Sequence, residues 1–261
     1  MWVFVWETIK MKKTLTATLL WIFLFWWCMA LAFEPVFVRN PLNIPWIYNP
    51  ISWYYEPKTE EEIKKELEQD KISKMDFYSD VSLQKFLDDN HPLESKYDAN
   101  DVVKINSDFT SNKSSDFMLR KEAAEMFEWM AWAFSKAFDF KAKLTINSAR
   151  RSQAYQRKLA ATCSTSRCAT PWTSEHEAWL ALDLGVNWVN IKAWSGKYYQ
   201  WLVDNAHKYG FHNTYQRWME IDGKMVEPWH WRYMWVDLAT ILYDNNQTFA
   251  EYFYQNIEPS I

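Results

Sequence analysis

Apolar and polar positions alternate with helical spacing over several parts of this chain. Between residues 119 and 138 apolar side chains recur every three to four positions with charged side chains between them, which predicts an amphipathic helix. A second helical pattern, 198–209, ends at Gly210, a residue type that favours the C-terminus of a helix. A third helix is predicted at 152–161 with Ser152 as its N-cap, and a fourth at 236–245.

Two other segments have the alternation that is typical of strands. Leucines at 180, 182 and 184 alternate with Ala181 and Asp183, so we expect Asp183 to face away from the leucine side of a strand. Residues 143–147 predict another strand, and Asp222-Gly223 predicts a hairpin turn whose second strand runs through 227–233. Helices and short strands without a regular β-α-β order favour an α+β fold, a small antiparallel sheet flanked by helices.

The N-terminal segment has the order of regions found in a targeting sequence. Lys12 and Lys13 precede an apolar run at 15–29, and Ala-Leu-Ala follows at 30–32. This order predicts a signal peptide; the alternatives are an uncleaved membrane anchor or a lipoprotein-type site at Cys28. Each of these places the remaining chain outside the cytoplasmic membrane, with membrane contact through this segment alone.

Composition divides the chain into four parts. Prolines among aromatic residues follow the N-terminal segment and predict an extended tether. Thr59 and Glu62 then form a capping box, which predicts a short charged helix. We expect a signal peptide or anchor at 1–32, a linker with short helices at 33–95, a compact, monomeric domain at 96–250 and a tail at 251–261.

Glycine and tryptophan usage is abnormal. The 261 residues include 4 glycines and 18 tryptophans, whereas average usage would give about eighteen glycines. Trp172 follows a proline in a turn-like segment, Trp218 lies in a polar turn, and Trp235 follows a predicted strand. Our hypothesis is that many of these codons are UGA, read as Gly by the source organism and translated here as Trp. The alternative is a protein that uses many tryptophans for packing.

Charge and cysteine content indicate the compartment and the partners. The net charge of −4 gives no basic surplus, so we expect no binding to nucleic acid. Cys163 and Cys168 form a close pair, which in an exported chain predicts a disulfide loop that contributes about 2 kcal/mol. The alternative is metal ligation, but no second cysteine pair completes a ligand set.

Two segments far apart in the sequence carry the residue types of a catalytic zinc site. His176 and Asp183 lie in the first, and Glu227 and His230 in the second. Two imidazoles and one carboxylate leave the fourth position of tetrahedral Zn²⁺ open for water. Glu227 would be the proton acceptor for that water, although on a regular strand it would face away from His230 unless Pro228 marks a bulge. The set predicts a zinc hydrolase.

These motifs resemble those of the VanY-type D-alanyl-D-alanine and L,D-carboxypeptidases, the M15B zinc peptidases of bacterial cell walls. Residues 174–183 follow the pattern S-x-H-x-x-G-x-x-x-D, and 227–230 spell E-P-W-H. Residues 148–152 are similar to the family's S-[GA]-Y-R-S, with Arg150 where an aromatic residue is common. Trp179 occupies the glycine position of the first motif. The UGA hypothesis would restore that glycine.

The resemblance implies a function and a role for each site residue. It implies that the chain removes terminal D-Ala from peptidoglycan stem peptides, by D,D or L,D cleavage, in the bacterial cell envelope. An endopeptidase of the same superfamily is one alternative, and an inactive zinc-containing wall-binding protein, in which Trp179 blocks the cleft, is another. The implied roles are zinc ligation by His176, Asp183 and His230, proton transfer by Glu227, and substrate binding by Arg151, Gln156, Ser174 and Tyr215, with Arg151 on the terminal carboxylate.

Overall fold

The computed structural model describes residues 47–48, 55–56, 58–105, 108–114, 116–192 and 196–258. The chain divides into two compact units, Met1–Leu67 and Glu68–Ile261. In the first unit β1 (Ile47–Tyr48) pairs antiparallel with β2 (Tyr55–Glu56). The predicted signal peptide or anchor lies outside the described residues. Within the described ranges, no helix has the length and apolar character needed to cross a bilayer.

Helix α2 (Glu60–Ile72) begins at the predicted capping box. The Thr59 amide donates to the Glu62 carboxylate at 2.8 Å, and the Glu62 amide donates to the Thr59 hydroxyl at 3.2 Å. These two bonds satisfy amide groups that the first turn of a helix leaves unpaired. The prediction of a short charged helix is therefore confirmed.

An antiparallel sheet forms the centre of the second unit, with the strand order β5-β6-β9-β8 and β7 paired to β6. Its strands are β5 (Leu144–Ser148), β6 (Ala181–Val186), β7 (Val189–Asn190), β8 (Phe211–His212) and β9 (His230–Tyr233). A separate hairpin pairs β3 (Val102–Lys104) with β4 (Met118–Arg120). On β6, Leu182 and Leu184 are fully buried and Asp183 is half-buried on the other face, as their alternation predicted. Asp183 lies opposite His230 on β9.

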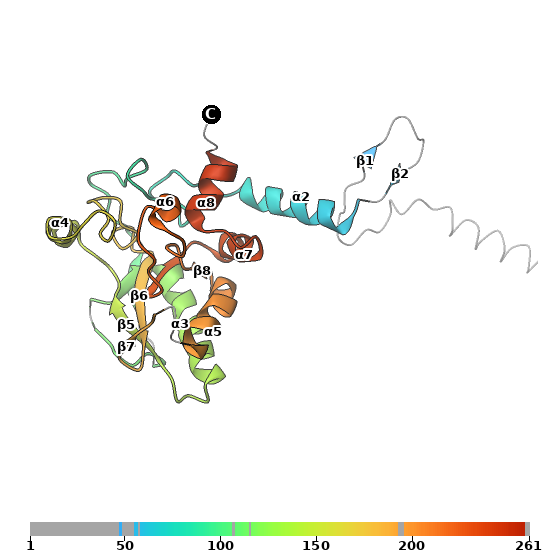
Figure 1. Ribbon diagram of the computed structural model, residues 1–261. Coiled ribbons are helices and arrows are strands. Elements are labelled where there is room, and N and C mark those ends of the chain that lie inside the picture. The colour runs from blue at the N-terminus through green and yellow to red at the C-terminus, as the bar shows by residue number, and fades with distance from the viewer. Residues whose placement is uncertain are drawn as a thin grey trace, which may run out of the picture. The chain divides into compact units, whose positions relative to one another are not determined.

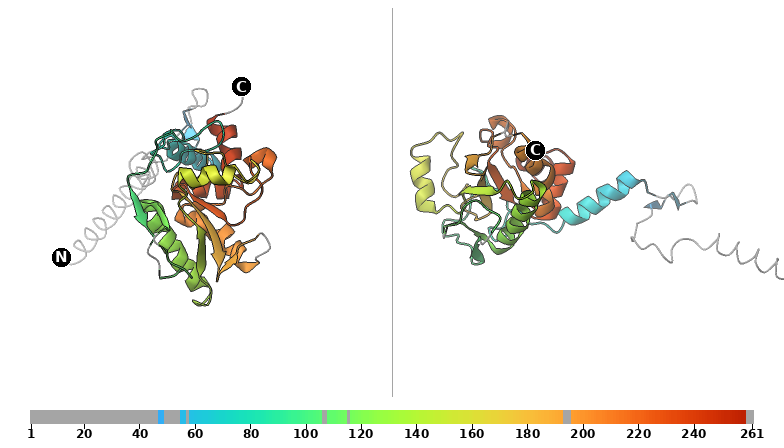
Figure 2. Two further views of the ribbon diagram at one scale, coloured as in Figure 1. Left: turned by 90° about the vertical axis from the view of Figure 1, so that its left-hand side faces the viewer. Right: turned by 90° about the horizontal axis from the view of Figure 1, so that it is seen from below.

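The second unit contains further helices, some of which contribute large apolar side chains to its core. They are α3 (Lys121–Ala137), α4 (Gln153–Ala160), α5 (Lys197–Asn205), the 3-10 turn η2 (Ala206–Tyr209), α6 (Met219–Asp222), α7 (Val236–Asp244), α8 (Phe249–Tyr252) and the π-helical turn η3 (Phe253–Ile257). On α3, Phe127 packs against Phe211 of β8, and Phe134 packs edge-on against Trp201 of α5. Helix α4 lies apart from α3 in all three views (Figures 1 and 2). The mixed α and β architecture with a small antiparallel sheet agrees with the expected class.

Two predicted helix ends are confirmed by their local geometry. The hydroxyl of Ser152 accepts a hydrogen bond from the Tyr155 amide at the start of α4. Gly210 follows η2 with φ at 76°, and a Cβ there would lie 2.5 Å from the Tyr233 ring. Both the left-handed backbone and the close ring favour glycine at 210.

The predicted hairpin at Asp222-Gly223 is wrong. Asp222 ends α6, and Gly223, at φ 70°, caps it by donating its amide to the Met219 carbonyl at 3.0 Å. Strand β9 begins only at His230, and the His230 amide closes a turn on the Glu227 carbonyl at 3.0 Å. Glu227 therefore precedes the strand, and no bulge is needed to bring it to the face of His230.

The packed region extends beyond the predicted domain at both ends. Phe77 and Phe86, from the segment predicted as linker, are buried with Phe249, and so is Phe253 from the predicted tail. The rings of Phe86 and Phe253 stack with centroids 4.1 Å apart. The two ends of the second unit thus share one apolar cluster, which is separate from the main core under the sheet.

Tryptophans occupy backbone conformations that favour glycine. In the described part of the chain, half of the non-glycine residues with positive φ are Trp: Trp172 (76°), Trp179 (62°), Trp188 (71°) and Trp235 (77°). Asn187 and Trp188, both with positive φ, connect the paired residues Val186 and Val189; this two-residue turn prefers Asn-Gly. Trp235 combines φ 77° with ψ 149°, a region nearly restricted to glycine. Trp218 has φ −95°, so its backbone does not require glycine.

Candidate functional site

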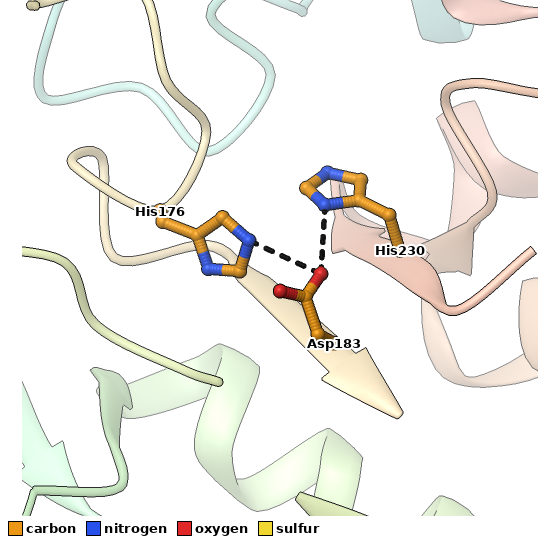
Figure 3. Close-up of side chains that lie close together, drawn as sticks. All are labelled: His176, Asp183 and His230. Atoms are coloured by element: carbon orange, nitrogen blue, oxygen red, sulfur yellow. Dashed lines mark hydrogen bonds and ion pairs between the residues drawn. The ribbon is translucent and has the colours of Figure 1, made fainter. Parts of the chain in front are cut away.

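Three side chains that the sequence predicts as ligands converge on one point. His176 comes from the loop before β6, Asp183 from β6 itself and His230 from the first position of β9 (Figure 3). Asp183 Oδ1 lies 3.3 Å from His176 Nε2 and 3.3 Å from His230 Nδ1. One ligand atom of each residue lies within 4.8 Å of the other two. Two imidazole nitrogens and a carboxylate oxygen are the donor set of many catalytic zinc sites.

The loop before β6 holds His176 rigidly. Its imidazole Nδ1 donates to the Ala149 carbonyl, with 2.6 Å between the two atoms, so Nε2 is the nitrogen that faces Asp183. The buried carboxylate of Glu177 accepts hydrogen bonds from the amides of Trp172 at 2.8 Å and Ser174 at 3.4 Å. Burial lowers the pKa of His176 and so favours the neutral imidazole that a metal ion requires.

Whereas His176 faces the site with Nε2, His230 faces it with Nδ1. Its Nε2 lies 2.7 Å from the Glu175 carboxylate, so Nδ1 faces Asp183. Burial opposes charge on His230, but its hydrogen bonds to Asp183 and Glu175 raise its pKa to about 10 in the metal-free protein. Burial likewise opposes ionisation of Glu175, but Arg232 and His230 outweigh it and lower the pKa of Glu175 to about 2. Glu175 was not predicted as a site residue, although it lies directly before His176.

Glu227 lines the same cavity, which has a volume of about 170 Å³, as the three ligand residues. Its amide donates to the Tyr215 carbonyl at 2.9 Å, and its carbonyl accepts from the Asn213 side chain at 2.8 Å. Burial raises the pKa of the Glu227 carboxyl. A half-buried carboxylate with a raised pKa beside a candidate metal centre is suited to accept a proton from water.

Arg151 also lines this cavity. Its Nη1 donates to the Gln156 side chain at 3.0 Å, its Nη2 lies 3.6 Å from Asp183 Oδ2, and its buried Nε has no hydrogen-bond partner among the described residues. Gln156 is fully buried, outside the cavity lining, and donates to the Ala169 carbonyl at 2.6 Å. Gln156 thus contacts the Arg151 guanidinium without lining the cavity itself.

Ser174 and Tyr215 are cavity-lining residues as well. The Tyr215 ring lies 4.8 Å from the His230 ring, centroid to centroid, and burial raises the pKa of its hydroxyl well above the ordinary value. The predicted disulfide is present: Cys163 and Cys168 are bonded with their Cα atoms 5.9 Å apart, and Cys168 lines the cavity. The cavity therefore contains all of the predicted polar site residues except Gln156.

Trp179, at the glycine position of the motif, is nearly buried and is not among the residues that line this cavity. Its indole lies under the guanidinium of Arg150, with 4.2 Å between the guanidinium carbon and the ring centroid. The side chain therefore does not block the site, in contrast to the expectation for an inactive protein.

Comparison with known proteins places the motifs in a family. Residues 116–236 match the family model described as VanY, D-alanyl-D-alanine carboxypeptidase. A D-alanyl-D-alanine carboxypeptidase of Enterococcus faecalis is 36% identical over 85 residues, 32% of this chain and 31% of that protein. The putative carboxypeptidase YodJ of Bacillus subtilis is 30% identical over 180 residues, 62% of this chain and 64% of that protein. The alignments thus span less than two thirds of either relative.

Solved structures show the same fold. The LdcB LD-carboxypeptidase superposes with a TM-score of 0.59 at 26% identity, covering 67% of this chain and 86% of that one. VanYB in complex with D-alanine-D-alanine gives a TM-score of 0.52 at 23% identity, covering 67% of this chain and 98% of that one. A VanY D,D-pentapeptidase mutant in complex with Zn(II) also gives 0.52 at 23% identity, covering 66% of this chain and 99% of that one. The resemblance inferred from the motifs is confirmed.

Proposed function

Because this chain belongs, over residues 116–236, to the VanY family of D-alanyl-D-alanine carboxypeptidases, we propose that it is a zinc-dependent carboxypeptidase that releases terminal D-Ala from peptidoglycan stem peptides. The main support is the convergence of His176, Asp183 and His230 with Glu227 and Arg151 around one cavity. The structural neighbours agree with this substrate class, since one binds D-alanine-D-alanine and another is described for peptidoglycan recognition.

The donor set fits zinc. Each imidazole has one nitrogen occupied, by Ala149 or by Glu175, which leaves the other nitrogen for the metal. His176, Asp183 and His230 supply three ligands, the number found in catalytic zinc sites with an open position. Zinc bound there would acidify a water molecule and polarise the scissile carbonyl.

Glu227 then moves the proton. Its carboxylate accepts a proton from the attacking water and returns it to the leaving amine of D-Ala. The raised pKa of Glu227, which results from burial, makes it a stronger base than an exposed glutamate. Because the hydroxyl of Tyr215 stays protonated at neutral pH, it is available to donate a hydrogen bond in the same cavity.

Arg151 binds the terminal carboxylate of the substrate. Its Nε is buried without a partner among the described residues, which is costly unless a ligand supplies an acceptor. A charge-assisted bond of this kind contributes on the order of 1.5–3 kcal/mol. Gln156 fixes the orientation of the guanidinium, and Ser174 lines the same subsite.

These observations favour a carboxypeptidase over the two alternatives. An endopeptidase cleaves inside a peptide, so it needs no cation to bind the free C-terminal carboxylate of its substrate. In this chain the cation Arg151 lines the cavity. An inactive wall-binding protein was expected to have Trp179 in the cleft, whereas the indole packs under Arg150. The Cys163–Cys168 disulfide suits an oxidising, extracytoplasmic location. We further propose that the enzyme is a monomer whose membrane contact is limited to the N-terminal segment.

We also propose that Trp172, Trp179, Trp188 and Trp235 stand where the native protein has glycine, encoded by UGA. All four have positive φ, and the excess of tryptophan matches the deficit of glycine. At Trp218 the negative φ neither requires nor excludes glycine, so the case there rests on composition alone. Peptide mass spectrometry of the protein from its source organism tests this directly. Glycine at these four positions is expected, and tryptophan there would refute the recoding.

The activity is tested with purified protein on two defined stem peptides, a pentapeptide ending in D-Ala-D-Ala and the corresponding tetrapeptide. Released D-Ala is measured with zinc and with a chelator. We expect release from at least one peptide, loss of release with chelator, and a fall of about 10²–10⁴-fold in Glu227→Gln. Glu220→Gln is the control, since Glu220 is exposed on α6 and outside this cavity. Full activity in Glu227→Gln would refute the mechanism.

A further inference from the structure

A buried carboxylate contacts one candidate metal ligand from behind. Glu175 is 3% exposed, and its Oε2 lies 2.7 Å from His230 Nε2. The same oxygen accepts from the Thr214 hydroxyl at 2.7 Å, and Oε1 accepts from Arg232 Nη1 at 2.9 Å. Glu175 is directed away from Asp183 and the metal-facing nitrogen, so it is not itself a ligand in this arrangement.

We propose that Glu175 is a positioning residue that selects Nδ1 of His230 as the metal-binding nitrogen. An imidazole has two nitrogens, and the one that donates a hydrogen bond cannot bind a metal ion. Glu175 accepts a hydrogen bond from Nε2–H, which leaves Nδ1, the nitrogen that faces Asp183, as the one that can bind the metal. This inference rests on the proposed function only in assuming that the site binds zinc.

The two histidines are held by partners of different charge. His176 donates to a backbone carbonyl, that of Ala149, whereas His230 donates to a carboxylate that is paired with Arg232. A carboxylate partner increases the basicity of the ligating nitrogen more than a carbonyl does, and it orients the ring. Glu175 therefore strengthens the His230 ligand as well as aligning it.

Arg232 holds the Glu175 carboxylate in place through a buried ion pair. Its guanidinium is fully buried, and Nη2 donates to the Lys85 carbonyl, in a segment that precedes the family-matched range. Thr214 supplies the third hydrogen bond to the carboxylate. Because each of these partners is buried, the orientation of Glu175 does not depend on solvent. The result is a chain of contacts from Lys85 through Arg232 and Glu175 to His230.

The test measures zinc binding without substrate. Metal-stripped parent protein and Glu175→Gln compete for zinc with a chromophoric chelator. We expect Glu175→Gln to bind zinc about 10–100-fold more weakly. The matched control is Asp222→Asn, which removes another buried carboxylate, one bonded to the Arg217 amide at 2.6 Å and outside the cavity that holds the ligands. Asp222→Asn should bind zinc as the parent does.

A spectroscopic measurement separates positioning from a general effect on folding. In the zinc-loaded parent, ¹⁵N NMR of the His230 ring should show a protonated Nε2 and a metal-bound Nδ1, and in Glu175→Gln the Nε2 signal should shift because its partner is no longer a carboxylate. If Glu175→Gln loses the parent's near-UV circular dichroism, Thr214→Val is used instead, because it keeps both charges and removes one bond to Glu175. Weaker zinc binding in that variant is expected.

The outcomes distinguish this inference from the proposed activity. Parent-like zinc affinity in a folded Glu175→Gln, or in the Thr214→Val substitute, overturns the positioning role. Equal weakening in Asp222→Asn overturns it too, because the loss of any buried carboxylate would then have the same effect. Zinc binding that depends on Glu175, in a protein that releases no D-Ala, would contradict the carboxypeptidase function and leave the role of Glu175 intact.

Discussion

Two exposed tryptophans allow the glycine hypothesis to be tested by stability alone. Trp188 is 69% exposed and has φ 71°, whereas Trp218 is 73% exposed and has φ −95°. Replacing either by glycine removes little buried surface. The Trp188 amide, which donates to the Thr145 hydroxyl at 2.8 Å, is retained in Trp188→Gly. The two substitutions therefore differ mainly in backbone conformation.

The expected effects have opposite signs. A non-glycine residue in the left-handed region costs roughly 1–2 kcal/mol, which Trp188→Gly relieves. Glycine also increases the entropy of the unfolded chain, at a cost of about 0.5–1 kcal/mol. We expect Trp188→Gly to stabilise the fold by up to about 1 kcal/mol and Trp218→Gly to destabilise it by about 0.5–1 kcal/mol.

Urea unfolding of the parent and both variants measures the difference, with thermal unfolding as a second readout. For a protein of this size, 1 kcal/mol corresponds to roughly 2–4 °C in Tm. The variant midpoints should lie on opposite sides of the parent. If Trp188→Gly is destabilised as much as Trp218→Gly, the left-handed strain at 188 is not real, and the structural argument for glycine there fails.

Three further predictions concern pH, substrate binding and the disulfide. Burial lowers the pKa of His212 from the ordinary value of 6.5 to about 4, so between these two pH values the unfolded chain binds one proton that the folded chain does not. The free energy of unfolding should therefore decrease as the pH drops through this window. Urea unfolding at several pH values should show that this decrease is roughly 3 kcal/mol smaller in His212→Gln. Arg151→Lys should raise KM for peptides with a free C-terminus by about 10-fold, because the Nε donor and the planar fork are lost, and steady-state kinetics check this. Joint replacement of Cys163 and Cys168 by serine should cost about 2 kcal/mol in urea unfolding, an effect that reduction of the parent should reproduce.

Local signals in the sequence were sufficient to predict several helix ends. The capping box at Thr59, the N-cap at Ser152 and the left-handed Gly210 each act within one turn of backbone, so their residue types predict the geometry. The hairpin predicted at Asp222-Gly223 is wrong for a related reason. A glycine with positive φ follows a helical turn as readily as it completes a hairpin, and the sequence does not separate the two.

The remaining features depend on contacts between distant segments. Phe77 and Phe86 lack helical or strand periodicity, and their burial results from packing against Phe249 and Phe253. The candidate ligands could be identified because they occupy fixed positions in short motifs. The proposed role of Glu175 instead depends on its contacts with His230 and Arg232, which are far away in the sequence. Short motifs thus predicted most of the candidate site, but not the buried network that supports it.

The central claim is that His176, Asp183 and His230 bind one zinc ion. It is tested most directly by a crystal structure of the zinc-loaded protein with anomalous data at the zinc edge. We expect a single strong peak within about 2.0–2.2 Å of His176 Nε2, His230 Nδ1 and an Asp183 oxygen. The absence of a peak among these atoms, or zinc bound only elsewhere, would contradict the account.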